Sequence, residues 1–461
     1  MRDTSDGRLY SASDLVNFLG CRHATFLDLR QLVDPVKLPE DPDAHELLQQ
    51  KGIEHERAHL ARLRAEGKRI VEIPEDGPLD GRVAATLAAL RDGAEVVYQG
   101  VLRDGEWHGY ADFLVRTDTC ASKFGAYAYE VADTKLARSA KAKHAIQLCA
   151  YADLLGRLQG VLPPRLHVAL GTNETVSLRT EDYIDYFALA RDRFLGFVAK
   201  PPAGSEPERC AHCQFCRWAT YCGQSWIDID HPNQVAGITG AQIAALAAAG
   251  ITTLAALAKA PAKRKIDDLQ PETFARLRAQ AALQLHKRET GEDAREILPA
   301  AAGRGFARLP KPDSGDVFFD MEGDPLVIGG LEYLFGLVHA DGGKAGFTCF
   351  WGHDPTGEKE AFERTVDFIT KRLERHPDAH IYHYASYEAT ALKTLATKHA
   401  TREFEIDQLL RHHKLVDLYK VVREGIRVSE PGYSIKNLET FYWKGKRSGA
   451  VTSAGDSIVI Y

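Results

Sequence analysis

The stretch "YAYEVADTK" at residues 127–135 limits most strongly what this chain can fold into. Its aromatic and β-branched residues predict a β-strand, which ends with Asp133 and Lys135 two positions apart. Because side chains alternate along a strand, the acid and the lysine point to the same face. Such a pair can share a metal, a water molecule and a phosphate, or it can form an ordinary salt bridge at a strand end.

Two flanking segments predict partners for this pair. The run "HGYADFLVRT" predicts a neighbouring strand that carries Asp112, and a helix is predicted over 140–158. That helix carries Gln147 and Tyr151 four positions apart, on one face. Carboxylates held on adjacent strands suit Mg²⁺ or Mn²⁺, which neutralise phosphate charge and activate an attacking water. Lys135 would stabilise the charge that develops on the phosphate.

Length and composition indicate a globular protein with several domains. The chain has 461 residues, too many for one core, and predicts two to four domains. Apolar residues make up 44% and charged residues 26%, as in ordinary folded proteins. The sequence contains neither a membrane-spanning apolar run nor the apolar core of a signal peptide, so we expect a cytoplasmic protein with no membrane partner. The net charge of −6 neither suggests nor excludes nucleic acid as a ligand.

The order of the predicted elements divides the chain into three parts. Residues 1–225 mix strands and helices, which indicates an α/β nuclease-like core. Residues 226–300 predict Ala-rich helices with glycine turns, either a helix-hairpin-helix that can hold a phosphate or a helical linker bundle. Residues 301–461 predict a three-stranded meander followed by alternating strands and helices, the order of a ribonuclease-H-like fold.

Four of the eight cysteines stand close together in "CAHCQFCRWATYC". They are Cys210, Cys213, Cys216 and Cys222. In a reducing compartment such a cluster indicates metal or iron–sulfur ligation rather than disulfide bonds. A set of four thiolates suits zinc and a [4Fe–4S] cluster equally by count.

The third part of the chain carries acids of its own. In "FFDMEGD", Asp320 and Glu322 share one strand face. The run "HYASYEATAL" supplies Glu388 after a later strand, and we interpret Asp417 in "LVDLYKVV" as structural. The alternative is a folding domain whose acids stand at strand ends without a catalytic role.

Seven runs together resemble the bacterial RecB-like nuclease family, over nearly all of the chain. The runs are "GCRHATFLDL", "GIEHERAHLARL", "GYADFLV", "YEVADTKLA", "QLCAYADLL", "HCQFCRWATYC" and "FDMEGDP". In that family a PD-(D/E)xK nuclease domain of restriction-endonuclease-like fold, a helical module and a ribonuclease-H-like domain precede a superfamily 1 helicase. The resemblance implies that Asp112 and Asp133 bind metal, that Lys135 activates water, and that Gln147 and Tyr151 position the nucleic-acid strand.

The resemblance also implies a third metal ligand on an early helix. In "GIEHERAHL" this ligand is His55, with Glu56 or His59 as substitutes. The family more often has three residues between the glycine and the histidine, whereas two separate Gly52 from His55 here.

The cysteines resemble the iron–sulfur staple of AddB-type and CRISPR-associated RecB-like exonucleases. The resemblance implies that Cys21 joins Cys213, Cys216 and Cys222 around a [4Fe–4S] cluster, with zinc as the alternative. Such a site would clip the first helix to the end of the nuclease domain. Cys210 departs from the family pattern as a fifth thiol that could replace a ligand or stay free.

The Asp-x-Glu of the third part resembles the opening of DEDD exonucleases, in which both acids bind two metals. Glu388 stands where relatives carry an aspartate, and Asp456 is a poor substitute for the final family acid. We therefore expect the ribonuclease-H-like domain to be incomplete. The sequence contains no Walker A motif, so we expect any helicase to be a separate domain or subunit.

These observations predict a cytoplasmic Mg²⁺- or Mn²⁺-dependent DNA nuclease, an exonuclease on single-stranded ends in DNA repair or processing. Two alternatives stay open. One is a non-catalytic nucleic-acid-binding module of a helicase–nuclease. The other is an RNA-processing nuclease that uses the ribonuclease-H-like acids.

Overall fold

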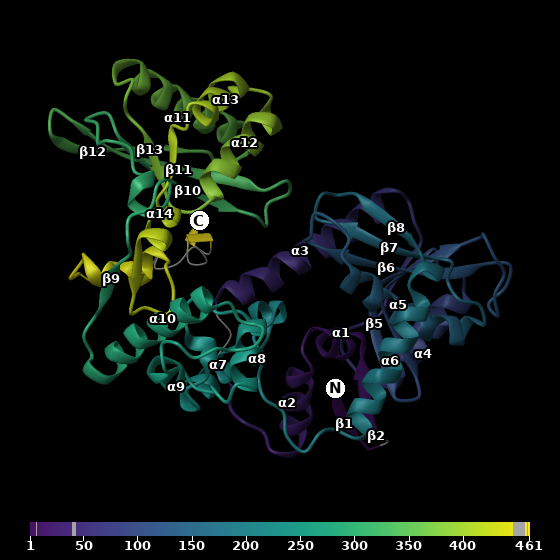
Figure 1. The fold of residues 1–461 in the computed structure, drawn as a ribbon. Helices are drawn as coiled ribbons and strands as arrows, with labels where there is room; N and C mark the ends of the chain where they lie inside the picture. Colours follow the sequence, from purple (N-terminus) through teal and green to yellow (C-terminus); the bar gives the residue numbers. More distant parts are fainter. Residues whose placement is uncertain (6, 39–42, 446–456, 459) are drawn as a thin grey trace. The chain divides into compact units, whose positions relative to one another are not determined.

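The strands and helices that the sequence predicts form two separate units, Met1–Cys222 and Gly223–Tyr461. The computed structural model describes residues 1–5, 7–38, 43–445, 457, 458, 460 and 461 (Figure 1). The division between the units lies close to the domain boundary that we expect at residue 225. The helical segment and the ribonuclease-H-like segment both belong to the second unit, and their separation into two domains stays a prediction.

A mixed sheet of eight strands is the centre of the first unit. Its main path runs β1-β2-β5-β6-β7-β8, and β4 pairs with both β5 and β3. The strands are β1 (Arg2–Thr4), β2 (Gly7–Ser11), β3 (Ile70–Glu72), β4 (Val96–Asp104), β5 (Trp107–Thr117), β6 (Ala128–Lys135), β7 (Arg165–Leu170) and β8 (Thr175–Arg179). The helices are α1 (Ala12–Gly20), α2 (Arg22–Val33), α3 (Asp43–Ala65), α4 (Leu79–Arg91), α5 (Ala142–Gln159) and α6 (Ile184–Ala199), and α7 (Ala219–Asp228) contains the division between the units.

The central strand β6 pairs antiparallel with β5 and parallel with β7. It is buried along its length except at Lys135, as expected for a β-branched and aromatic run inside a sheet. Helix α5 adds side chains such as Leu148 to the same core and ends at Gly160, which has a φ of 79°. A Cβ at Gly109 in β5 would lie 2.6 Å from the Tyr151 ring. This glycine therefore lets α5 approach the sheet closely.

Cys21 lies between the first two helices. A capping box starts α1, in which Asp14 N–H donates to the Ser11 hydroxyl and Ser11 N–H donates to the Asp14 carboxylate. Helix α1 ends at Gly20, and Cys21 follows with extended backbone before α2 begins. The sequence predicts Cys21 inside or at the end of the first helix, and the structure has it at the end.

Short helices begin the second unit. They are α8 (Gly240–Ala248) and α9 (Leu254–Lys259), followed by the longer α10 (Pro271–Thr290). Thr239 and Thr253 cap α8 and α9. Gly237 and Gly250, in the turns before and after α8, have φ values of 73° and 76°, which glycine adopts without steric cost. The two short helices therefore lie where the alanine-rich sequence predicts them.

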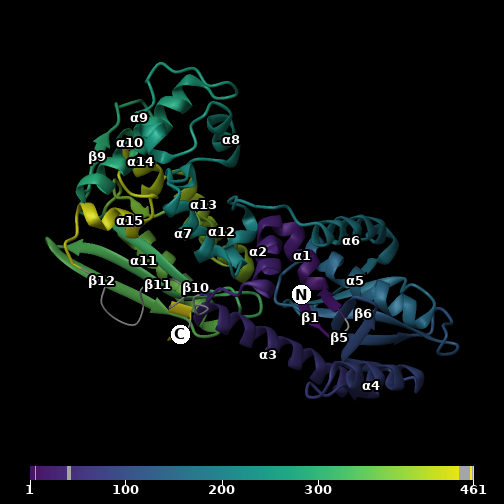
Figure 2. The ribbon, with the colours of Figure 1, turned by 90° about the horizontal axis from the view of Figure 1, so that it is seen from below.

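A second sheet of five strands follows, in the order β12-β11-β10-β13-β14. Figure 2 shows β10, β11 and β12 side by side. The strands are β10 (Val317–Asp324), β11 (Leu331–Asp341), β12 (Lys344–Trp351), β13 (Ile381–His383) and β14 (Leu415–Asp417). The helices are α11 (Pro355–Arg375), α12 (Tyr387–His399), α13 (Glu403–Arg411), α14 (Leu418–Gly425) and α15 (Ile435–Leu438). The first three strands are antiparallel. Strand β13 pairs in parallel with β10, and β14 pairs in parallel with β13.

Strand β10 has one face in the core and one face toward solvent. Val317, Phe319 and Met321 are buried in the core that includes side chains of α11. Phe318 and Asp320 alternate with them and are exposed. One side of this sheet is therefore open, and it carries the acids that the sequence selects.

A small sheet ties the helical segment to the C-terminal segment. It consists of β9 (Arg295–Ile297) and β15 (Ile426–Val428), which pair antiparallel. The buried Gln280 side chain of α10 donates to the Val428 carbonyl at 2.8 Å. Across the described ranges of both units, no helix combines the length and the apolar character needed to cross a membrane.

Candidate functional site

The first acid cluster lies where the β5–β6 ladder ends. Backbone pairing stops at Phe113 and Ala132. Beyond that pair, the Thr134 N–H and hydroxyl both donate to Asp112 Oδ2, each at 2.8 Å. The Lys135 ammonium forms an ion pair with the Asp133 carboxylate. The structure thus brings Asp112, Asp133 and Lys135 together at the point where the strands separate.

The electrostatics of this cluster favour a cation. Burial raises the pKa of Asp133 well above its usual value, and the nearby Asp112 raises it further against the opposing effect of Lys135. Burial alone lowers the pKa of Lys135, but Asp133, Asp112 and Glu56 together raise it above the usual lysine value. Asp133 Oδ2 is buried and accepts no hydrogen bond of regular geometry. Two neighbouring carboxylates therefore share a single lysine, and a bound cation would relieve the repulsion between them.

Helix α3 brings further candidate ligands to this region. The buried His55 ring donates from Nε2 to the Ala169 carbonyl at 3.2 Å. A metal-binding histidine usually makes such a hydrogen bond with one ring nitrogen and binds the metal with the other, which here is Nδ1. Burial and the neighbouring Asp112 raise the pKa of Glu56. Burial, Arg62 and His55 lower the pKa of His59 to about 4.

Gln147 and Tyr151 face the acids from α5. The Gln147 amide donates to the Tyr151 hydroxyl at 3.1 Å. Burial raises the pKa of Tyr151, and the Asp133 carboxylate raises it further. The two side chains that the sequence places on one helix face are therefore in contact, and Tyr151 is near the acid cluster.

Five of the eight thiols gather in the first unit. Cys210 Sγ lies 3.8 Å from Cys213 Sγ and 3.5 Å from the carbonyl oxygen before Cys21. Burial and, to a smaller extent, the four other thiols of the group together raise the pKa of the Cys222 thiol to about 12. Burial likewise raises the pKa of Cys21, as do Cys210 and Cys216.

Asp28 in α2 holds this thiol group together. Its Oδ1 accepts hydrogen bonds from the buried Trp218 indole at 2.7 Å and from Arg217 at 2.6 Å. The segment after Cys216 is thereby fixed to the helix that follows Cys21. The donor set suits zinc or an iron–sulfur cluster. Among the residues that the structure describes, no three His, Cys, Asp or Glu side chains are already arranged around one metal position.

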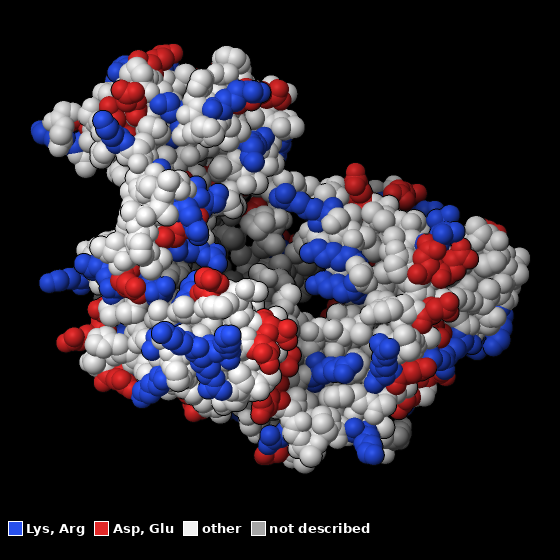
Figure 3. All heavy atoms as spheres, in the orientation of Figure 1, with Lys and Arg blue, Asp and Glu red and all other residues white. Residues whose placement is uncertain are grey.

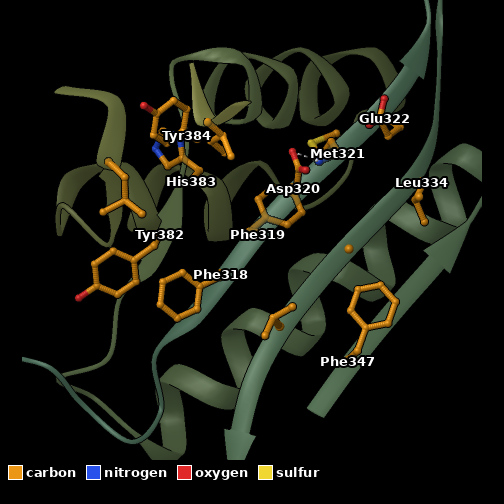
Figure 4. Close-up of a pocket in the computed structure, with 14 residues that line it drawn as sticks. Phe318, Phe319, Asp320, Met321, Glu322, Leu334, Phe347, Tyr382, His383 and Tyr384 are labelled. Carbon is orange, nitrogen blue, oxygen red and sulfur yellow. Dashed lines mark hydrogen bonds between the residues drawn. The ribbon is translucent and has the colours of Figure 1, made fainter. Parts of the chain in front are cut away.

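A second acid cluster lies on the open side of the five-stranded sheet. Figure 4 shows Asp320 and Glu322 along β10, with the Phe318 ring on the same strand. They line a cavity of about 410 Å³, which we call the acidic pocket. Asp320 is open to solvent on one side, but the surrounding pocket walls partly desolvate it; this raises its pKa despite the hydrogen bond from the Met321 N–H, and Glu388 raises it further. Burial, Asp320 and the opposite-strand carboxylate Glu332 raise the pKa of Glu322.

Two residues at this cluster escape sequence reasoning. His383 Nδ1 lies 3.4 Å from Glu388 Oε2, and both side chains are buried. Glu332 pairs with Gly323 in the strand register, and a Cβ at Gly323 would lie 2.1 Å from its carboxylate. For His383, the only sequence signal is that it stands near the end of the predicted strand "HIYHYA". Glu332 could be placed beside Glu322 only with knowledge of how β10 and β11 are aligned.

Aromatic side chains form one wall of the acidic pocket. Phe318 and Tyr382 stack with ring centroids 5.2 Å apart (Figure 4). Phe318 is 52% exposed and Phe347 is 66% exposed. Exposed aromatic rings of this kind offer faces on which the bases of a single strand can stack.

Two further acids that the sequence points to in this segment are Asp417 and Asp456. Asp417 caps α14 and accepts hydrogen bonds from the Tyr419 and Ala385 N–H groups. Asp456 lies outside the residues that the structure describes.

Comparison with known families agrees with the C-terminal topology. The model of the RNase_H superfamily matches residues 317–461. The match begins at the first residue of β10 and includes all five strands of the second sheet. No curated protein matches the chain. The RecB-like resemblance and the PD-(D/E)xK core stay predictions, whereas the ribonuclease-H-like part is confirmed: residues 317–461 form an RNase_H-superfamily domain.

Proposed function

We propose that this protein is a metal-dependent nuclease, a phosphodiester hydrolase that acts on single-stranded DNA ends. The observation that carries the proposal is the convergence of Asp112, Asp133 and Lys135 at the end of the β5–β6 ladder. A buried aspartate with a raised pKa beside a second acid and a lysine is a common arrangement at functional sites. A role in DNA repair or processing, beside a helicase domain or subunit, belongs to the same proposal.

In this mechanism Asp112 and Asp133 hold the cation, with His55 as the third ligand and Glu56 or His59 as substitutes. A bound Mg²⁺ or Mn²⁺ supplies charge neutralisation and a more acidic water. Lys135 stabilises the charge that develops on the phosphate. The contact between Gln147 and Tyr151 supports their role in positioning the strand.

The thiol group is proposed to hold a [4Fe–4S] cluster, with zinc as the alternative. Cys21, Cys213, Cys216 and Cys222 are the proposed ligands, and Cys210 is close enough to replace one of them. The group fastens the α1–α2 junction to the segment that closes the first unit, so its proposed role is structural.

The acidic pocket is a second candidate centre for hydrolysis. The family match and the exposed rings beside Asp320 and Glu322 favour it. Asp320, Glu322 and Glu388 are the proposed acids, and RNA is the substrate under this alternative. A nucleic-acid-binding role without cleavage is the remaining alternative.

The test measures nucleotide release from single-stranded DNA labelled at the 5′ or the 3′ end, with Mn²⁺ and the full chain. We expect Asp133→Asn and Lys135→Ala to abolish release, whereas Asp118→Asn, a surface acid of the same unit, leaves it unchanged. Equal cleavage by the wild type and Lys135→Ala refutes the first centre. Loss in Asp320→Asn with retention in Asp133→Asn assigns hydrolysis to the acidic pocket.

A further inference from the structure

A second cavity of the Gly223–Tyr461 unit is strongly basic. It has a volume of about 780 Å³, and five of its lining side chains are cationic. We call it the basic pocket; its cations are Arg276, Arg304, Lys420, Arg423 and Arg427. They come from α10, the turn before the 3-10 helix at Gly305–Arg308, α14 and β15. Figure 3 shows Lys and Arg side chains gathered over α14.

Two of the five cations have no salt-bridge partner within the part of the chain that the structure describes, whereas Arg427 forms an ion pair with Glu296 and Lys420 pairs with Asp417. Among the described residues, neither Arg276 nor Arg304 forms a side-chain hydrogen bond or an ion pair. Burial lowers the pKa of Arg276, and the like charges of Arg423 and Arg427 lower it further. Like charges that crowd one cavity cost free energy unless an anion enters it.

The two carboxylates of the pocket are already engaged elsewhere. Glu424 accepts from Arg308 at 2.6 Å and from the Gly305 N–H at 3.0 Å, and these contacts lower its pKa to about 2. Asp417 caps α14 through one oxygen, and its other oxygen lies 3.7 Å from the Lys420 ammonium. Both acids therefore have other partners, and of the two unpaired arginines only Arg304 is close enough to Glu424 to lower its pKa.

Two tyrosines add aromatic surface. The Arg423 guanidinium lies 5.9 Å from the centre of the Tyr419 ring. The Tyr433 hydroxyl donates to the buried Gln280, which also binds the β15 backbone. A basic cavity with rings held in place is typical of sites that follow a single nucleic-acid strand.

The basic pocket is adjacent to the acidic pocket. Three stretches of chain pass from one lining to the other, at Tyr384–Ala385, Asp417–Tyr419 and Tyr433–Ile435. The Tyr384 hydroxyl donates to the Tyr433 carbonyl, so this shared wall is held together. A strand with one phosphate at the acids would reach the arginines with its following phosphates.

We propose that the basic pocket binds the phosphate backbone of a single nucleic-acid strand that continues from the acidic pocket. This inference goes beyond the proposed function, because it concerns binding and does not require either acid cluster to cleave. The ligand chemistry is a run of phosphodiesters rather than one phosphate, because the cations come from four separate elements around a large cavity.

The test uses the full chain in chelator and fluorescence anisotropy of labelled oligothymidylate over a range of salt concentrations. Each phosphate contact contributes about 0.7 to the slope of log affinity against log salt for a single strand. We expect Arg276→Gln and Arg304→Gln each to reduce the slope by about 0.7 and to weaken binding about fivefold near 0.1 M salt. Arg375→Gln, an exposed arginine of α11 outside the pocket, is the matched control and should leave both quantities unchanged.

Two outcomes of the binding assay overturn the proposal. One is a wild-type slope in both pocket variants. The other is thymidine monophosphate that binds as tightly as the oligonucleotide with the same sensitivity to Arg276→Gln, which identifies a small phosphate ligand. Photo-crosslinking of a bromouracil oligonucleotide gives an independent measurement: crosslinks at Tyr419 or Tyr433 support the strand path, and crosslinks only elsewhere refute it. Because none of these assays measures cleavage, an inactive protein with a normal salt slope refutes the nuclease proposal alone.

Discussion

Replacing Asp133 with asparagine tests whether this residue belongs to a metal site or only to a structural salt bridge. The Asp133 side chain is 2% exposed, and burial together with Asp112 raises its pKa despite the Lys135 ammonium. The ionised carboxylate is therefore a net cost to the metal-free fold at neutral pH. We expect Asp133→Asn to be inactive and yet to raise the free energy of unfolding in chelator.

The magnitude follows from the burial of a carboxylate whose Oδ2 contacts the Lys135 ammonium but accepts no hydrogen bond of regular geometry. Such a group costs about 1–3 kcal/mol, and each kcal/mol shifts the melting temperature by roughly 2–4 °C in a unit of this size. A metal that binds the folded wild type at about 100 times its Kd adds about 2.7 kcal/mol. Because Asp133→Asn loses this gain, its advantage should vanish or reverse in Mn²⁺.

The pH dependence has a defined sign. A carboxyl whose pKa is raised by folding binds more protons when folded, so its cost is absent below the unfolded pKa of about 4. The free-energy cost of the buried Asp133 carboxylate grows as the pH rises from the unfolded pKa of about 4 toward the pKa of Asp133 in the folded protein. The advantage of Asp133→Asn should therefore be larger at pH 7 than at pH 4.

The assay is urea unfolding, followed by circular dichroism with chelator or Mn²⁺, with Asp118→Asn as the surface control. Asp133→Asn that is less stable than the wild type in chelator, at both pH values, would refute this reasoning. That result means that the Asp133–Lys135 pair stabilises the fold, as an ordinary salt bridge at a strand end does.

Three further predictions concern the thiols, the indole contact and the second acid cluster. Cys213→Ser should remove the iron or zinc found by metal analysis of anaerobically prepared protein, whereas Cys120→Ser should not. Asp28→Ala should lower the free energy of unfolding by about 1–3 kcal/mol, because the Trp218 indole N–H loses its buried acceptor; urea unfolding measures this. Gly323→Ala should displace the carboxylate on the opposite strand, since the new Cβ would lie 2.1 Å from it. Calorimetry should then show weaker Mn²⁺ binding when Gly323→Ala is combined with Asp133→Asn, which removes the first proposed metal site.

Matched controls decide these outcomes. Asp34→Ala, at an exposed acid after α2, should leave stability nearly unchanged. Gly196→Ala, where a Cβ meets open space in α6, should leave Mn²⁺ binding unchanged. Retained metal in Cys213→Ser, or unaltered Mn²⁺ binding in Gly323→Ala, contradicts the corresponding assignment.

Local sequence signals were sufficient for most elements of this fold. The alternation in "YAYEVADTK" predicts β6, and the helix predicted over 140–158 is α5. The meander and the later alternating elements predict the ribonuclease-H-like part, which the family match confirms. Within "KLVDLYKVV" the strand β14 ends at Asp417, because this residue caps α14. Periodicity and caps act within a few residues, so a single sequence reports them.

The chemistry of the sites was decided only by tertiary structure. The alternation put Asp133 and Lys135 on one face, but the direction of the Asp133 pKa depends on burial and on Asp112 from another strand. The contact of His383 with Glu388 joins a strand to the following helix, and the basic pocket collects cations from residues 276–427. Burial and charge proximity depend on which distant segments pack together, and neither periodicity nor spacing encodes that packing.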